Sequence, residues 1–184
     1  MKKIKTQSAQ PFSTADAKAW LRITHADEDT VVADVVGAAA QAWEDATGYM
    51  LRSTTFQDRV TGNPDGYLFA AGPDVSLVTV THNGTAYTVT TSSDVVRIAY
   101  DGGRPRLIVK NKSVWTSDGE TLIDWTAKPT DAGTVGDVPV LVKIAVFSHM
   151  GTLYENRESV APVMLHAVLH GWRGIAASHS WVGL

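Results

Sequence analysis

The sequence predicts an α+β fold, a small antiparallel helical bundle with an inserted antiparallel β-rich region. In residues 12–50 and 137–174, apolar side chains recur every three or four positions, which is the period of an amphipathic helix. Residues 51–128 instead alternate loosely and are rich in threonine and valine, which is typical of strands. Helical segments near both ends of the chain therefore enclose a segment of a different kind.

Two helices are expected in residues 12–50. The first begins at Phe12-Ser13-Thr14, where Ser13 can cap the free N–H groups of the first turn, and it ends near Ile23. The second lies within residues 27–51, with Asp27 or Asp29 as its cap. Gly48 follows its last turn and suits the left-handed conformation that often ends a helix.

The middle of the second helix is unusually slim, because alanine occupies positions 38, 39, 40 and 42. Another backbone can approach such a surface closely. We expect Ala39 and Trp43 to pack against a further helix, either in the core of the same subunit or in a neighbouring subunit, and we include both among the candidate interface residues.

The inserted region contains several strand-like segments separated by turn residues. They cover residues 51–61, 75–81, 85–91, 95–100, 106–110 and 121–126. Asn83-Gly84 predicts a tight hairpin, since both central residues of such a turn need positive φ. Asp101-Gly102-Gly103 predicts a second turn, so the region should form a small antiparallel sheet or two layers of one.

The C-terminal helices are expected in residues 137–174. Asp137 can cap the first, and Gly171 and Gly174 should fray the end of the second. The tail, residues 175–184, is nonpolar without a regular pattern, and Trp181 and Leu184 are candidates for docking onto the fold or onto a partner. Residues 1–11 are expected to form a polar arm.

Composition excludes several classes of protein. The chain has 184 residues, which fits one domain, and its net charge of −3 gives no overall attraction to nucleic acid or anionic lipid. The absence of cysteine excludes disulfides, thiolate nucleophiles and cysteine zinc sites. The opening MKKIK lacks the apolar run of a signal peptide, and no segment has the length of a membrane span.

Catalytic patterns are also missing. His166 and His170 have the H-x-x-x-H spacing of zinc ligands, but Ala167 stands where a zinc hydrolase carries its glutamate base. No nucleophile elbow or phosphate-binding loop is present. We therefore expect no enzyme activity, no metal and no cofactor.

One stretch is locally basic. Five cations face only Asp101 across positions 97–112, namely Arg97, Arg104, Arg106, Lys110 and Lys112. On a hairpin they could contact DNA phosphates, which makes a DNA-binding module the alternative function. The other explanation, which we favour, is an edge strand protected from aggregation by charge.

Three segments, taken together and in order, resemble the head–tail connector (adaptor) proteins of tailed bacteriophages and related gene-transfer particles. They are AKAWLRI at residues 17–23, the block at residues 27–51 with its DED start and TGYML end, and LYENRE at residues 153–158. The inserted region resembles the branch of that family with a β-rich insertion.

The resemblance implies a structural part of the virion neck, assembled in the cytoplasm of a bacterial host. Such proteins form a homo-oligomeric ring, typically a dodecamer, under the portal. The ring extends the channel for viral DNA and gives the stopper or tail-completion protein its platform, with no membrane involved. Tyr154, Arg157 and Glu158 would lie at a conformationally important helix end, and residues 159–184 would engage the portal, with Trp181 and Leu184 in the tail.

Overall fold

The structure is a computed structural model that describes residues 3–9, 11–72, 74–89, 94–101, 104–128, 138–156 and 165–178. It confirms the α+β class, with four α-helices and two antiparallel sheets among these residues. The chain forms two compact units where the sequence led us to expect a single domain. The strand unit comprises residues 1–8 and 52–132, and the helical unit comprises residues 9–51 and 133–184.

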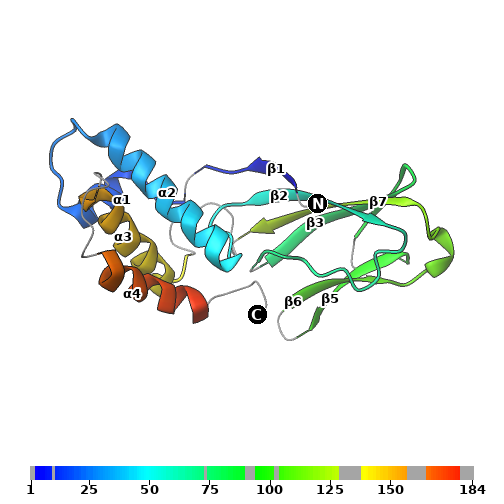
Figure 1. Cartoon of the computed structure of the whole chain (residues 1–184). Helices are drawn as coiled ribbons and strands as arrows, with labels where there is room; N and C mark the ends of the chain where they lie inside the picture. The colour runs from blue at the N-terminus through cyan, green and yellow to red at the C-terminus, as the bar shows by residue number, and fades with distance from the viewer. Residues whose placement is uncertain are drawn as a thin grey trace. The chain divides into compact units, whose positions relative to one another are not determined.

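The helical unit contains α1 (Thr14–Leu21), α2 (Asp29–Thr47), α3 (Val140–Glu155) and α4 (Leu165–Ser178), shown in Figure 1. α2 and α3 run antiparallel, because Tyr154 at the end of α3 hydrogen-bonds to Glu28 at the start of α2. Their facing sides are apolar and fully buried, as are parts of α1 and α4 that pack on them. Among the largest fully buried side chains of this core are Trp43, Phe147 and Met150.

The ends of the helices test the capping predictions. Ser13 caps α1 as predicted, accepting a hydrogen bond of 3.0 Å from the Asp16 N–H. Gly48 ends α2 with φ of 67°, also as predicted. The predicted aspartate cap of α2 is wrong: Glu28 is the N-cap residue and makes no side-chain cap bond, since its carboxylate accepts from Tyr154 instead.

The last helix continues further than its glycines predict. α4 runs through Gly171 and Gly174 to Ser178, so the predicted fraying there is wrong. Ala176 is 5% exposed and belongs to the helical core, and this burial offsets the cost of the two glycines. The predicted cap at Asp137 lies outside the described residues, and α3 follows Pro139 directly.

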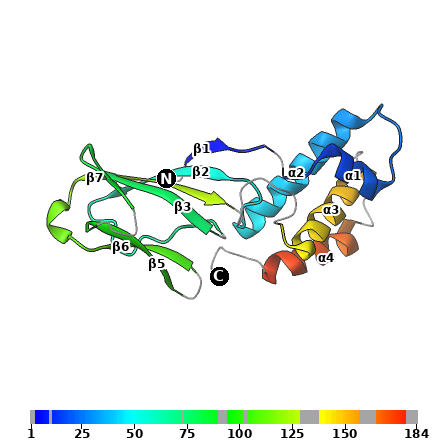
Figure 2. The ribbon, with the colours of Figure 1, turned by 180° about the vertical axis from the view of Figure 1, so that it is seen from behind.

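The strand unit has two layers, as Figure 2 shows from behind. A five-stranded sheet has the order β1 (Lys3–Gln7), β2 (Thr54–Thr61), β7 (Glu120–Lys128), β3 (Asp74–His82) and β4 (Thr85–Thr88). A two-stranded ribbon, β5 (Val96–Asp101) and β6 (Arg104–Val109), forms the second layer, and a short 3-10 helix (Lys112–Val114) leads toward β7.

Aromatic side chains fill the space within the strand unit. Trp125 of β7 is fully buried and packs its ring 4.6 Å from that of Phe56 and 5.2 Å from that of Phe69. The segment that carries Phe69 also holds the ribbon, since the Leu107 N–H donates to the Tyr67 carbonyl at 2.9 Å. Burying a side chain of this size contributes about 1.5–3 kcal/mol, so these rings secure the ribbon to the sheet.

Two further local predictions can be compared with the structure. Asn83 and Gly84 have φ of 46° and 84°, which confirms the tight hairpin between β3 and β4. The polar arm expected at residues 1–11 instead contains β1, whose five residues are all exposed while its backbone pairs with β2. None of the helices within the described residues combines the length and apolar character needed to cross a membrane.

Candidate interaction surfaces

The alanine-rich face of α2 belongs to the core of this chain. Ala39 and Trp43 are each 1% exposed and pack with α3 residues such as Val146. Of the two locations considered for them, the structure therefore supports the subunit core, and their assignment to an interface is corrected. A helix surface made slim by alanine lets α3 approach, because short side chains permit close contact between helix axes.

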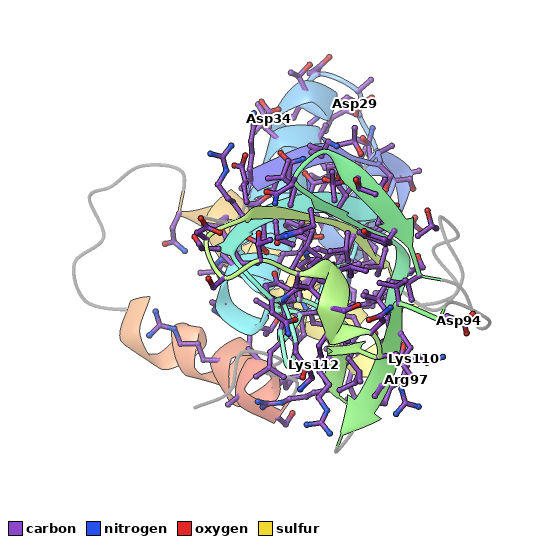
Figure 3. All side chains as sticks on the ribbon, turned by 90° about the vertical axis from the view of Figure 1, so that its right-hand side faces the viewer. Asp29, Asp34, Asp94, Arg97, Lys110 and Lys112 are labelled. Carbon is purple, nitrogen blue, oxygen red and sulfur yellow. The ribbon has the colours of Figure 1, made fainter. Side chains whose placement is uncertain are left out.

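The opposite side of α2 is exposed and acidic. Asp29 and Asp34 project from this helix in Figure 3, and both are exposed. Asp29 forms an ion pair of 2.6 Å with Lys18 of α1. Further along, Asp45 accepts a hydrogen bond of 2.9 Å from the Gln41 amide.

The end of α3 is tied to the start of α2. The Tyr154 hydroxyl donates to the Glu28 carboxylate, and both side chains are partly buried. Arg157 and Glu158, the other candidates at this helix end, lie outside the described residues. The predicted portal-docking residues Trp181 and Leu184 lie outside them as well.

The first turns of α3 present an apolar surface that the sequence analysis did not identify. Val140, Leu141 and Ile144 are 72%, 59% and 38% exposed. Nearby, the exposed ring of Trp20 in α1 packs 5.6 Å from Phe147. Apolar residues are spread around α3 without forming one stripe, so its sequence pattern does not indicate which side is left uncovered.

The register of the ribbon determines which face each of its basic residues occupies. Arg97 pairs with Ile108, Ala99 with Arg106, and Asp101 with Arg104. Because paired residues of an antiparallel ribbon point to the same face, Arg97, Arg104 and Arg106 share one face. Lys110 continues this face, since its N–H donates to the Val95 carbonyl at 2.8 Å beyond the last pair. We call these four residues the basic face.

The reverse face of the ribbon is apolar and is buried except near the turn, where Tyr100 is 57% exposed. Val96 and Leu107 are fully buried and Val109 is 5% exposed. This burial requires Arg97, Arg104 and Lys110 to face outward, and all three are exposed, while Arg106 is half-buried. In Figure 3, Arg97 and Lys110 project to the same side of the ribbon.

Lys112 does not join the basic face. Its ammonium group lies 3.4 Å from the Asp65 carboxylate, and Figure 3 shows it apart from Arg97 and Lys110. Asp65 also accepts a hydrogen bond of 2.9 Å from the Val109 N–H. That backbone bond, with smaller contributions from Lys112 and Arg106, lowers the pKa of the Asp65 carboxyl group. Through its contacts with Val109 and Lys112, Asp65 therefore attaches the loop before Tyr67 to the end of β6.

Within the described residues, no group of three or more acidic, histidine or cysteine side chains is placed to hold a metal. His166 and His170 both lie in α4, but their side chains are outside the description. The Tyr67 hydroxyl donates to Asp58 in the strand unit, and burial, together with this carboxylate, raises the pKa of Tyr67. A tyrosine held protonated in this way is suited to a structural role.

Comparisons with known proteins agree on the fold. No family model and no curated protein sequence matches the chain. A chain of the virion of a native gene transfer agent particle matches with a TM-score of 0.74 and 22% identity, covering 100% of this chain and 97% of its own. Chains from the neck of an empty particle computed with C6 symmetry and of a native particle computed with C12 symmetry match with TM-scores of 0.69 and 0.67. Their identities are 22% and 21%, with the same coverage.

Proposed function

We propose that this chain is a structural subunit of the neck of a phage-like particle, a head–tail connector. The observation that carries the proposal is the fold match over the whole chain to chains of gene transfer agent particles, two of which are described as particle necks. In this proposal several copies, twelve in the expected form, assemble as a ring under the portal. The ring extends the DNA channel and offers the attachment platform for the stopper or tail.

The surface of the helical unit supports an assembling role. Val140 and Leu141 are more than half exposed, and the exposed ring of Trp20 packs on Phe147 of the same helix. Exposed apolar side chains grouped in this way commonly mark a protein–protein contact. Neighbouring subunits of a ring make head-to-tail contacts through two different surfaces, and the apolar start of α3 is a candidate for one of them.

The proposed partners follow from this position. They are further copies of the chain, the portal protein, and a stopper or tail-completion protein. Tyr154, together with Arg157 and Glu158, remains our candidate for a helix end that changes conformation on assembly, and Trp181 and Leu184 for contact with the portal. The protein would act in the virion neck, after assembly in the bacterial host cytoplasm, without enzyme activity.

Electron microscopy of particles assembled without this chain tests the proposal. We expect filled heads that lack tails and lose DNA, and a wild-type copy supplied in trans should restore tailed particles. Particles that are complete and keep their DNA without the chain would contradict a connector role. The number of copies in the neck of restored particles then gives the size of the ring.

A further inference from the structure

We infer that the basic face of the ribbon, formed by Arg97, Arg104, Arg106 and Lys110, binds the phosphate backbone of double-stranded DNA without reading its sequence. The inference does not depend on the proposed connector role, because it concerns one folded chain and one duplex. It treats this ribbon surface as a binding site, whereas the sequence alone favoured a protected strand edge.

The arrangement of charge is the first argument. The ribbon register places four cations on one face, with Asp101 paired to Arg104, and the Asp65 carboxylate interacts with the charge of Arg106. Positive formal charges outnumber negative ones at this face, in a chain whose total is −3. A local charge opposite in sign to the whole molecule marks a surface suited to a polyanion.

The state of the cations is the second argument. Within the described residues, neither Arg97 nor Arg104 pairs with a carboxylate, and both are exposed. Elsewhere in the strand unit, Lys5 pairs with Asp124 and Arg59 pairs with Glu120. The guanidinium groups of Arg97 and Arg104 are therefore available to an external anion.

Rigidity is the third argument. Val96, Leu107 and Val109 on the reverse face are buried, so the ribbon presents its cations from an anchored backbone. Side chains two positions apart on one strand lie roughly 6.7 Å apart, which allows neighbouring arginines to contact separate phosphates. Arginine also matches phosphate with two parallel hydrogen bonds.

The chemistry of the face favours phosphates over bases. Ala99 and Ile108 occupy the positions between the cations on this face. Neither offers a hydrogen bond to a base edge or an aromatic surface for stacking, which leaves the cations themselves to make the polar contacts with DNA. Binding should therefore be weak, independent of sequence and strongly dependent on salt.

The test is binding of the purified full chain to a labelled 30-base-pair duplex, followed by fluorescence anisotropy at several salt concentrations. If three to four phosphates are contacted, affinity should fall by about 40- to 150-fold between 50 and 200 mM salt. Two duplexes of unrelated sequence should bind equally. Absence of binding at low salt would overturn the inference, as would a preference of tenfold or more for one sequence.

Matched variants locate the binding surface. The triple variant Arg97→Gln, Arg104→Gln, Lys110→Gln should lose at least tenfold in affinity. The slope of its log affinity against log salt concentration should become shallower by about one per substitution. The control triple variant Lys5→Gln, Arg59→Gln, Lys112→Gln removes the same charge from ion-paired sites of the same unit. Equal loss in both would show a general charge effect and overturn the inference.

A competitor identifies the class of partner. Unlabelled duplex should displace the labelled one, whereas polyglutamate at equal charge concentration should displace it far less. If polyglutamate competes as well as DNA, the inference of a DNA-binding face is overturned, and an acidic protein surface becomes the expected partner. Circular dichroism of each variant checks that the fold is retained, which the exposure of the substituted residues leads us to expect.

Discussion

Tyr154 donates its hydroxyl hydrogen bond to the carboxylate of Glu28, joining two residues that lie 126 positions apart in the sequence. The bond connects the last turn of α3 to the residue that precedes α2. It also explains why Glu28 does not cap its own helix.

Tyr154→Phe removes this bond and leaves the Glu28 carboxylate without the hydroxyl donor. We expect the free energy of unfolding to fall by about 1 kcal/mol, the typical net contribution of such a bond. Urea unfolding followed by circular dichroism measures it. Tyr87→Phe serves as the control, because the Tyr87 hydroxyl makes no hydrogen bond within the described residues, and it should change stability by less than about 0.5 kcal/mol. Equal stability of Tyr154→Phe and wild type would contradict the role of the bond.

Ala39 and Ala38 are neighbours in α2 with opposite environments, since Ala39 is 1% exposed and Ala38 lies on the exposed side. Ala39→Trp should cost about 1–3 kcal/mol by overpacking the core. Ala38→Trp adds the same side chain to the surface and should leave stability within about 0.5 kcal/mol. Thermal unfolding of the two variants compares them directly, and similar losses would show that both faces are packed.

Leu141 and Val142 provide a similar pair in α3, because Leu141 is 59% exposed and Val142 is fully buried. Leu141→Asp should fold normally, whereas Val142→Asp should unfold, as a buried unpaired carboxylate is strongly unfavourable. If the ring uses this surface, Leu141→Asp should also reduce the incorporation of the chain into particles. Normal incorporation of the folded variant would exclude the start of α3 from the subunit contact.

The C-terminal segment can be divided by two truncations. Deletion of residues 175–184 removes Ile175 and Ala176, which pack in the helical core, and should destabilise the helical unit. Deletion of residues 179–184 spares α4 and should preserve the fold while weakening attachment to the portal. Sedimentation with portal complexes measures attachment, and full attachment of the shorter deletion would remove the tail from the proposed contact.

His149 gives a pH dependence to the helical unit. Its ring stacks on Trp172 with centroids 4.7 Å apart, and burial, aided by the positive charge of Arg173, lowers the pKa of His149. The unfolded chain therefore binds this proton more readily than the folded one. Stability should be full above the unfolded pKa of about 6.5 and should decrease as pH falls below it. Urea unfolding of wild type and His149→Phe at pH 7.5 and 5.5 tests this. The free energy of unfolding should fall less between the two pH values in His149→Phe than in wild type.

Local chemistry explains why several elements could be predicted. Gly48 and the Asn83-Gly84 pair adopt positive φ, which few residues tolerate, so their sequence signals are specific. Ser13 is likewise a cap with a bond to a residue three positions away. Signals of this kind depend on neighbours in the chain and need no knowledge of the fold.

Long-range contacts account for the errors. Glu28 could not be chosen over the flanking aspartates, because its partner Tyr154 is distant in sequence. β1 has the composition of a polar arm, and pairing with β2 makes it a strand. The basic face has the same origin: its members were visible in the sequence, but only the β5–β6 register separates them from Lys112.

The position of β7 has a consequence for synthesis of the chain. β7 lies between β2 and β3 in the sheet yet follows both in the sequence, so neither strand gains its main partner until residues 120–128 are made. The helical unit is completed later in synthesis, because α2 packs against α3 and the residues of the strand unit lie between these two helices in the sequence. The roughly 90 residues between them take about 5–20 s to synthesise at about 5–20 residues per second. During that interval the apolar side of α2 is not buried against α3. A nascent chain that stalls before Val140 would therefore expose Val32, Val36 and Trp43 to chaperones.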